Sequence, residues 1–438
     1  MKKCEIIFSR RQPDLCRKIS FRGLLPVLAL LAALLAIPTY GQDASPQTTD
    51  EKIQELMKQV QALQAQVQAL EAKQAAAPAA APAPAPAPEP VVEEQPAYAP
   101  PAGIKLHLFG DVGYSASDLK GTTDSFYLGS ADMFMTGNLS DHVSILGEIL
   151  FTSAPDNSIG VDVERLLLSY AQNDYFKFTV GRLHTSIGYY VPTFHRGEWF
   201  QTAIGPPFMY AFDDEGGAFP LQDVGASLSG KIPSGKLGLQ YVAEVGNGAD
   251  HAFGSEIAQN DHDTNNGKSV NFALSAHPPA VSGLDVGFSV YHDYLTFDNH
   301  IDHSELISTA YAVFTNSKYE FLNEAEVIRH VGSITGGPGT YNTLAFYTQF
   351  SRAFGKYRPY FRYQYFNSGV TDPIYNNPDL GLALGRRNGP SLGLRYDFND
   401  HAAVKLQYDH FAYRGLDPAN PRTEQISNAL TTEISFAY

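Results

Sequence analysis

Histidine and carboxylate side chains gather in two polar stretches, and these residue types could bind a metal. The first stretch holds Asp250, His251, Asp261, His262 and Asp263, and the second holds His292, Asp293, His300, Asp302 and His303. Histidine together with carboxylate can bind zinc or copper. Asp261, Asp263 and Asn265 begin like a calcium loop, but Asn266 stands where that loop needs glycine and Phe272 where it needs glutamate. Solvated external loops explain both stretches better than metal sites do, so we expect no metal and no cofactor.

Catalysis is the second kind of chemistry to consider. Serine, histidine and acidic residues are plentiful, but none lies in a G-x-S-x-G elbow or in another recognisable nucleophile context. The two cysteines, Cys4 and Cys16, lie in a segment that we expect to be removed, which excludes a cysteine nucleophile or a cysteine metal site. The sequence therefore predicts that the chain is not an enzyme.

Opposite charges form two further sets of residues. The acidic set lies in residues 184–222, the longest polar stretch, and consists of Glu198, Asp213, Asp214 and Glu215. The basic set lies at those alternate positions of the expected strands that would face the lumen, and it consists of Lys105, Arg358, Arg362, Arg395 and Lys405. Opposite charges on two faces of a water-filled passage would orient dipolar solutes and filter ions by charge. Ordinary solvated charges are the alternative.

These residues need a scaffold, and the chain predicts strands of about 8–12 residues throughout residues 102–438. Residues 143–152 form the clearest strand, because every second residue there is apolar. Short joints at residues 137–142, 173–175, 233–236, 278–283, 316–318, 354–357 and 399–401 alternate with eight long connections, among them residues 184–222, 246–267, 332–339, 367–389 and 412–427. This asymmetry is typical of an all-β, transmembrane antiparallel barrel of about 16 strands, with tight periplasmic turns and long external loops.

The faces of the expected strands agree with a membrane barrel. In each strand the apolar set fits lipid and the polar set fits a wet lumen. Many of the 25 Tyr and 27 Phe lie at strand ends, as in the aromatic girdles of such barrels. The last strand carries an apolar stripe that ends with Phe436 and Tyr438. This stripe is similar to the C-terminal signature that the barrel-assembly machinery reads, so these two residues predict an assembly signal.

The N-terminal quarter predicts three segments. Residues 1–41 form a signal peptide, with a basic region followed by the apolar run 23–37 and small residues before Gln42. Residues 42–74 form a helix whose apolar residues repeat with heptad spacing, which favours a short coiled coil over a helix docked on a neighbour. Residues 75–101 form an Ala/Pro-rich linker, because proline at every second position favours an extended chain. Export leads us to expect a periplasmic location for the coiled coil.

The net negative charge of the chain limits the kinds of molecule that it can bind. Asp and Glu number 46 against 31 Lys and Arg, and this acidic balance argues against nucleic acid. It fits external loops that share divalent cations with lipopolysaccharide.

The whole layout resembles the sixteen-stranded trimeric porins of Gram-negative bacteria, and among them the dicarboxylate-type and phosphate-selective porins, which carry an N-terminal periplasmic coiled coil. The resemblance covers nearly all of the expected mature chain as architecture rather than as a sharp motif. It implies a homotrimer in the outer membrane, assembled by the barrel-assembly machinery, with an N-terminal segment that could contact peptidoglycan.

The resemblance also gives the charged sets a role. In the porin family the loop that corresponds to residues 184–222 folds into the lumen and sets the constriction, where its acids face basic residues of the wall. The expected function is passive diffusion of small, charged, hydrophilic solutes, with a preference for anions because the basic residues repeat on neighbouring strands. The alternatives are a structural barrel that tethers the envelope and, less favoured, an outer-membrane barrel enzyme.

Overall fold

The computed structural model describes Lys58 and most of residues 103–438. Within the latter range the residues not described are 154–156, 195–198, 212–219, 252–256, 260–261, 264, 298–299, 333–338, 369–371, 373, 376–383 and 416–422. The chain divides into two units, residues 1–95 and 96–438. In the first unit Lys58 is helical and exposed. The predicted signal peptide and linker, and the predicted coiled coil apart from Lys58, lie outside the described residues.

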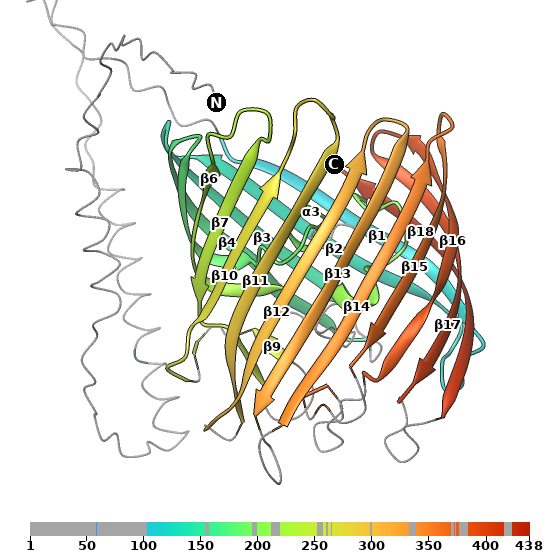
Figure 1. Cartoon of the computed structure of the whole chain (residues 1–438). Helices are drawn as coiled ribbons and strands as arrows, with labels where there is room; N and C mark the ends of the chain where they lie inside the picture. Colours follow the sequence, from blue (N-terminus) through green and yellow to red (C-terminus); the bar gives the residue numbers. More distant parts are fainter. Residues whose placement is uncertain are drawn as a thin grey trace, which may run out of the picture. The chain divides into compact units, whose positions relative to one another are not determined.

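The second unit is a closed antiparallel barrel of sixteen strands, in which β1 pairs with β18 to complete the ring (Figure 1). The strands are β1 (Lys105–Ser117), β2 (Ser125–Asn138), β3 (Val143–Ser153), β4 (Ile159–Asn173), β5 (Phe176–His184), β6 (Gln222–Lys231), β7 (Leu239–Gly246), β10 (Ser269–Ala276), β11 (Leu284–Phe297), β12 (His300–Thr315), β13 (Tyr319–Gly332), β14 (Gly339–Arg352), β15 (Tyr357–Asn367), β16 (Arg386–Asn399), β17 (Ala402–Arg414) and β18 (Glu424–Ala437). The predicted fold class and strand number are confirmed. Among the described residues, no helix is long and apolar enough to cross a bilayer.

Side chains alternate across the wall because successive residues of a strand point to opposite faces. On β16, Ser391 and Arg395 are buried on the inner face, whereas Leu392 and Leu394 are exposed on the outer face. The final strand follows the same rule: Leu430, Ile434 and Phe436 are exposed, and Glu433 and Ser435 are buried. Tyr438 continues the exposed stripe, and its N–H donates to the carbonyl oxygen of Leu108 at 2.8 Å. The predicted outward stripe is confirmed, and its recognition by the assembly machinery stays a prediction.

All seven predicted short joints connect neighbouring strands, but the prediction of eight long connections at the other end is partly wrong. Only residues 298–299 join β11 to β12, and residues 118–124 join β1 to β2. The second His/Asp stretch therefore lies largely within strands instead of in a loop, and Asp293 and His303 are buried. The reason is that a β-ladder is bonded through the backbone, so it can continue through a polar segment whose side chains become covered.

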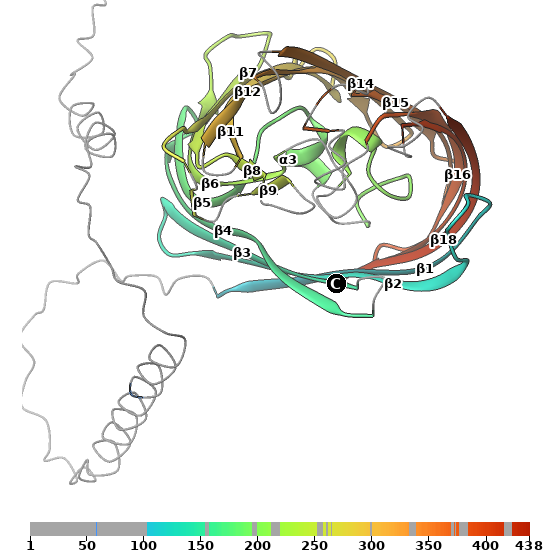
Figure 2. The ribbon, with the colours of Figure 1, turned by 90° about the horizontal axis from the view of Figure 1, so that it is seen from below.

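The connection between β5 and β6 lies inside the ring of strands (Figure 2). It contains the short helix α3 (Tyr190–Phe194) and the 3-10 turn η2 (Phe208–Tyr210). Apolar residues of this connection pack in one buried cluster with inner-face residues of the strands: Ile187, Tyr190, Met209 and Tyr210 from the connection, and Ile307, Ile328 and Tyr347 from the wall. A second connection carries the hairpin β8 (Ala249–His251) and β9 (Ile257–Gln259). The barrel interior is thus partly filled by its own connections.

Candidate functional site in the barrel lumen

The inward connection, residues 185–221, is the candidate site because it narrows the lumen. Its first turn is fixed by Glu324, a buried residue of β13. The Glu324 carboxylate accepts the N–H of Tyr189 at 2.6 Å and the hydroxyl of Tyr210 at 2.9 Å. Gly188 has a φ of +68°, and a β-carbon there would clash with both Glu324 and Tyr210, so only glycine fits. Two parts of the connection that lie 21 residues apart in sequence, at Tyr189 and Tyr210, therefore converge on one carboxylate.

Burial and the nearby Glu324 carboxylate together raise the pKa of Tyr210 well above its ordinary value. The hydroxyl therefore keeps its proton and remains a donor to Glu324. Further polar groups of the wall hold the connection along its length. Ser186 donates to Glu244 of β7 through its N–H at 2.9 Å, and the N–H of Phe208 donates to Gln364 of β15 at 2.8 Å.

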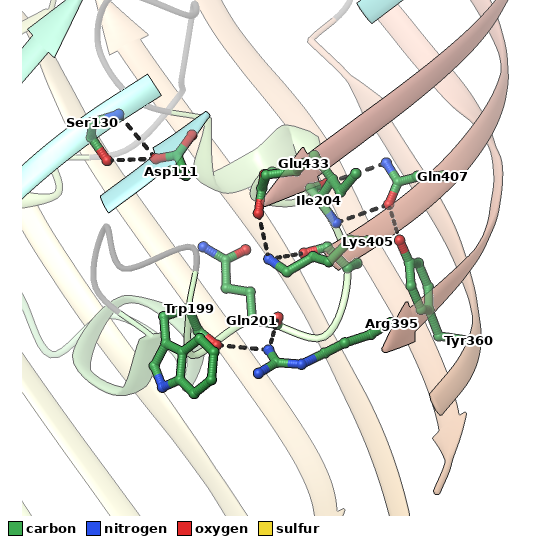
Figure 3. Close-up of polar contacts among 12 residues, drawn as sticks. Asp111, Ser130, Trp199, Gln201, Ile204, Tyr360, Arg395, Lys405, Gln407 and Glu433 are labelled. Atoms are coloured by element: carbon green, nitrogen blue, oxygen red, sulfur yellow. Dashed lines mark hydrogen bonds and ion pairs between the residues drawn. The ribbon is translucent and has the colours of Figure 1, made fainter. Parts of the chain in front are cut away.

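Three of the predicted basic residues bind the backbone of the connection. Figure 3 shows two of them, Arg395 and Lys405. Arg395 of β16 donates to the carbonyl oxygens of Trp199 at 2.7 Å and Gln201 at 2.8 Å. Lys405 of β17 donates to the carbonyl of Ala203 at 3.5 Å, and Arg362 of β15 donates to that of Gly205 at 2.8 Å. Alternate carbonyls of residues 199–205 thus meet a row of cationic donors. Such charge-assisted hydrogen bonds are stronger than neutral ones.

Gln407 completes this row on β17. Its side-chain oxygen accepts the N–H of Ile204 at 3.0 Å, and its amide nitrogen donates to the carbonyl of the same residue at 3.2 Å. Tyr360 of β15 donates to the same Gln407 oxygen at 2.9 Å (Figure 3). Side chains of β15, β16 and β17 therefore form hydrogen bonds with the backbone of residues 199–205 along its whole length.

The five predicted basic residues fall into two groups. Arg362, Arg395 and Lys405 are buried beneath the connection, and two of them also meet acids: Arg395 pairs with Asp397 and Lys405 with Glu433, each at 2.8 Å. Arg358 of β15 donates to Ser351 at 3.2 Å, and Lys105 of β1 is exposed. The predicted acidic partners Glu198, Asp213, Asp214 and Glu215 lie outside the described residues.

Aromatic side chains of the connection reach two different strands. The Arg395 guanidinium lies over the Trp199 ring at 4.8 Å from its centroid. The neighbouring Phe200 ring lies 5.0 Å from that of Phe109 on β1, and Phe200 is nevertheless 47% exposed. An aromatic side chain that is half open inside a channel offers solutes an apolar contact.

A third connection, between β15 and β16, is anchored to the inner wall by a buried histidine. His330 of β13 lies between two carboxylates, with Nδ1 at 2.8 Å from Asp372 and Nε2 at 2.8 Å from Glu305. Asp372 belongs to the connection between β15 and β16 and also accepts the N–H of Ile374 at 2.9 Å. Within the described residues, no group of three or more His, Cys, Asp or Glu side chains is arranged to hold a metal ion.

Sequence reasoning missed the anchors Glu324 and Gln407. A signal for Glu324 was present: the alternation in β13 places Glu320, Glu324, Glu326 and His330 on one face. A strand with four ionisable residues on its inner face is a natural site for an inward loop to dock. Gln407 carried no such signal, because an uncharged polar residue is ordinary on a lumen face.

No protein-family model and no curated protein matches this sequence. Solved structures are similar in fold. The anion-selective porin from Comamonas acidovorans is 11% identical, with a TM-score of 0.53 and coverage of 77% of this chain and 99% of that one. The outer-membrane channel DcaP of Acinetobacter baumannii is 8% identical, with a TM-score of 0.51 over 76% and 97% of the two chains.

Salmonella typhi OmpF in complex with daunomycin is also similar. It is 14% identical, with a TM-score of 0.50 over 76% of this chain and 97% of that one. All three similarities span the barrel and are too low in identity to carry a shared activity. The chain therefore has the fold of the sixteen-stranded outer-membrane porins.

Proposed function

We propose that the protein is a channel in the outer membrane of a Gram-negative bacterium, through which small, charged, hydrophilic solutes diffuse passively, and that it is not an enzyme. The observation that supports this most is the closed barrel of sixteen strands, in which described residues of the connection between β5 and β6 are hydrogen-bonded to the inner faces of β7, β13, β15, β16 and β17. Barrels of about 16 strands leave an aqueous channel, whereas about eight strands suffice for a barrel filled by side chains. An envelope tether would not need this width or an inward loop.

The electrostatic field inside the lumen at the constriction would determine whether the channel prefers anions or cations. Lys105, Arg358 and Arg362 have no carboxylate partner among the described residues, whereas Arg395 and Lys405 each have one. Three lumen cations without a paired acid support a preference for anions, opposed by Glu198, Asp213, Asp214 and Glu215 if these line the passage. The similar structure from Comamonas acidovorans is an anion-selective porin, which agrees with this sign.

The same proposal includes assembly. The protein would form a homotrimer embedded in lipid and lipopolysaccharide, after the barrel-assembly machinery has read the strand that ends with Phe436 and Tyr438. A trimer form of OmpT from Vibrio cholerae is among the similar structures, with a TM-score of 0.50 and 12% identity. The N-terminal segment would lie in the periplasm, where peptidoglycan is the candidate contact.

Single-channel recordings in planar bilayers test the channel and its selectivity together. We expect steady conductance steps and, across a tenfold salt gradient, a zero-current potential with the sign of anion preference. Changing Asp213 and Asp214 to Asn and Glu215 to Gln should move the potential further toward anions. Changing Lys105 and Arg358 to Gln should move it toward cations, and because neither bonds to residues 199–211, the constriction itself should remain.

Two results would overturn different parts of the proposal. Folded protein that gives no conductance steps would exclude the channel. A channel whose potential moves with neither set of substitutions would place these residues outside the conduction path. Hydrolysis of lipid or peptide by the folded protein at the rate of a dedicated enzyme would refute the non-enzymatic assignment.

A further inference from the structure

Three charged side chains form a row at one end of the barrel. Arg386 of β16 pairs in register with Arg414 of β17, and Arg414 pairs with Glu424 of β18. Nη2 of Arg386 lies 2.7 Å from one Glu424 oxygen, and Nη2 of Arg414 lies 3.2 Å from the same oxygen. Both guanidinium groups therefore converge on one point, and two positive charges in the row face one negative charge.

The row lies on the outer face of the barrel. Successive residues of a strand point to opposite faces, so residues an even number of positions apart share a face. Each member of the row stands an even number of positions from an exposed apolar residue of its own strand, and these residues are Leu392, Tyr408 and Ile426. The three charged side chains are themselves only partly buried. The row therefore faces the surroundings of the barrel and not the lumen.

The row lies at the level of lipid head groups. β16 begins at Arg386 and β17 ends at Arg414, so the row lies at the end of the barrel that carries the long connections. The next outward residue of β16 after Arg386 is Asn388, which pairs with Tyr365 of β15. The Tyr365 ring stacks on the Phe346 ring at 5.3 Å. Aromatic side chains on the outer face mark the boundary between hydrocarbon and head groups, and the arginines come directly beyond this boundary.

Most donors of the two guanidinium groups are unused. A guanidinium offers five N–H donors, whereas Arg386 and Arg414 each donate one hydrogen bond among the described residues, both to Glu424. Nε of Arg386 has no partner among those residues. Asp118, a carboxylate that contacts β18 farther along the strand, already accepts the N–H and the Nδ2 of Asn428. One carboxylate does not neutralise two arginines, so the row is suited to a further anion.

We propose that Arg386 and Arg414 bind a phosphate of the outer-leaflet glycolipid, the lipid A part of lipopolysaccharide, directly and without a bridging divalent cation. The planar fork of arginine matches the oxygens of phosphate and donates charge-assisted hydrogen bonds to them. The chain has a formal net charge of −15, so its total charge repels an anionic lipid and only a local basic site attracts one. This assignment rests on the proposed function, because only a barrel in the outer membrane presents this end to lipopolysaccharide.

Native mass spectrometry of the purified, folded full chain tests the site. The probe is lipid A with both of its phosphates, added in detergent with EDTA so that divalent cations do not bridge acidic groups to the lipid. The wild type should retain lipid A. The double variant Arg386→Gln with Arg414→Gln should bind it at least tenfold more weakly. Glu424→Gln should bind it more tightly than the wild type does, because the carboxylate that competes with phosphate is removed.

The matched control removes two cations at the opposite end of the barrel. Arg352 lies at the end of β14 with its guanidinium 4.6 Å from the centroid of the Phe354 ring, and Lys356 lies in the following short joint. Under the proposed orientation this end faces the periplasm and the phospholipid leaflet. Arg352→Gln with Lys356→Gln should therefore bind lipid A as the wild type does. An equal loss in both double variants would mean that lipid A responds to total charge, and would overturn the site.

Further results would also refute the site. They are undiminished binding in Arg386→Gln with Arg414→Gln, equal binding of lipid A that lacks its phosphates, loss of wild-type binding in EDTA, and displacement of lipid A by millimolar inorganic phosphate. If the arginine double variant does not fold, Glu424→Gln keeps the test valid, since a variant without tighter binding contradicts competition between carboxylate and phosphate.

Conductance separates this site from the channel itself. Neither arginine faces the lumen, so the arginine double variant should keep the single-channel conductance of the wild type. A wild type that binds lipid A but gives no conductance steps would refute the channel and leave the lipid site standing. A conducting wild type that does not bind lipid A would refute the lipid site alone.

Discussion

At the scale of single residues, the basic residues of the lumen have two roles, anchoring the connection and supplying charge. Their alternation along the strands cannot distinguish these roles. Arg395 and Arg358 both lie on inner faces of neighbouring strands, and their backbones are paired in the sheet. Arg395 nevertheless bonds two carbonyls of the inward connection, whereas the one side-chain hydrogen bond of Arg358 among the described residues goes to Ser351 of the adjacent strand. The first residue holds the constriction in position, and the second contributes charge to the lumen.

Arg395→Gln should therefore loosen the constriction. Hydrogen bonds to a charged group contribute about 1.5–3 kcal/mol each. Loss of the bonds to Trp199 and Gln201 therefore substantially weakens the attachment of residues 199–201 to the wall. We expect larger current fluctuations within the open state in single-channel recordings. Arg358→Gln is the control: it removes the same charge and should change the zero-current potential without adding noise. Equal noise in both variants would show that charge, and not anchoring, steadies the current.

Glu324 and Glu326 offer a second contrast between residues on one face of β13. Glu324 accepts several donors, among them the N–H of Tyr189 and the hydroxyls of Tyr210 and Tyr347. Glu326 is equally buried, but its carboxylate oxygens have no hydrogen-bond partner among the described residues. Glu324→Leu would leave buried donors unsatisfied at about 1–3 kcal/mol each, whereas Glu326→Leu removes a carboxyl group that is costly to bury.

Glu324→Leu should thus lower the midpoint of thermal unfolding of the folded barrel and raise current noise. Glu326→Leu should leave the midpoint unchanged or raise it. Circular dichroism during heating in detergent measures both. A fall of equal size in the two variants would mean that volume on this face, and not hydrogen bonding to the connection, determines stability.

At the scale of elements, the strands were predictable and the connections were not. Alternation in residues 143–152 and the apolar stripe of the last strand depend only on period two and on lipid outside, so the sequence contains them in full. The row formed by Arg395, Lys405, Arg362 and Gln407 binds carbonyls of residues 199–205, and these contacts join positions about 160–200 residues apart in a way no local pattern records. The His/Asp stretch near residue 300 was misjudged for the same reason, since pairing within the sheet and burial by other segments decided its structure.

The last strand gives a prediction at this scale. Phe436 is exposed on the outer face, while its neighbour Ala437 pairs with Phe109 and faces inward. Phe436 lies near the end of the strand, where a charge facing lipid costs only about 1 kcal/mol or less. Phe436→Asp should nonetheless reduce the amount of heat-modifiable barrel in the outer membrane severalfold, because it alters the proposed assembly signal. Ala437→Asp, which adds the same charge on the inner face, should assemble far better.

Gel mobility with and without heating, applied to isolated outer membranes, measures both amounts. Tyr438→Asp should behave like Phe436→Asp, since Tyr438 continues the outward stripe. Wild-type amounts of barrel from Phe436→Asp and Tyr438→Asp would refute the placement of the assembly signal in this strand.

At the scale of the whole molecule, two units divide the proposed work. Residues 96–438 carry the barrel with its own closed sheet, and residues 1–95 contain the predicted heptads. Fewer than three heptads specify an oligomer weakly, because each buried pair of a coiled coil adds little beside an interface between barrel walls. The barrel, and not the predicted coiled coil, should therefore determine the oligomeric state.

We accordingly expect the purified mature protein to be a trimer that survives mild detergent and separates into monomers only on boiling. Deleting residues 42–101 should leave a barrel of the same oligomeric state, because the strands that close the ring all lie beyond the deletion. Size-exclusion chromatography with light scattering, together with gels of unheated samples, measures the state of both proteins. If the full chain is a trimer and the truncated chain is a folded monomer, the N-terminal segment holds the subunits together, and the predicted coiled coil is then the oligomerisation element instead of an accessory to it.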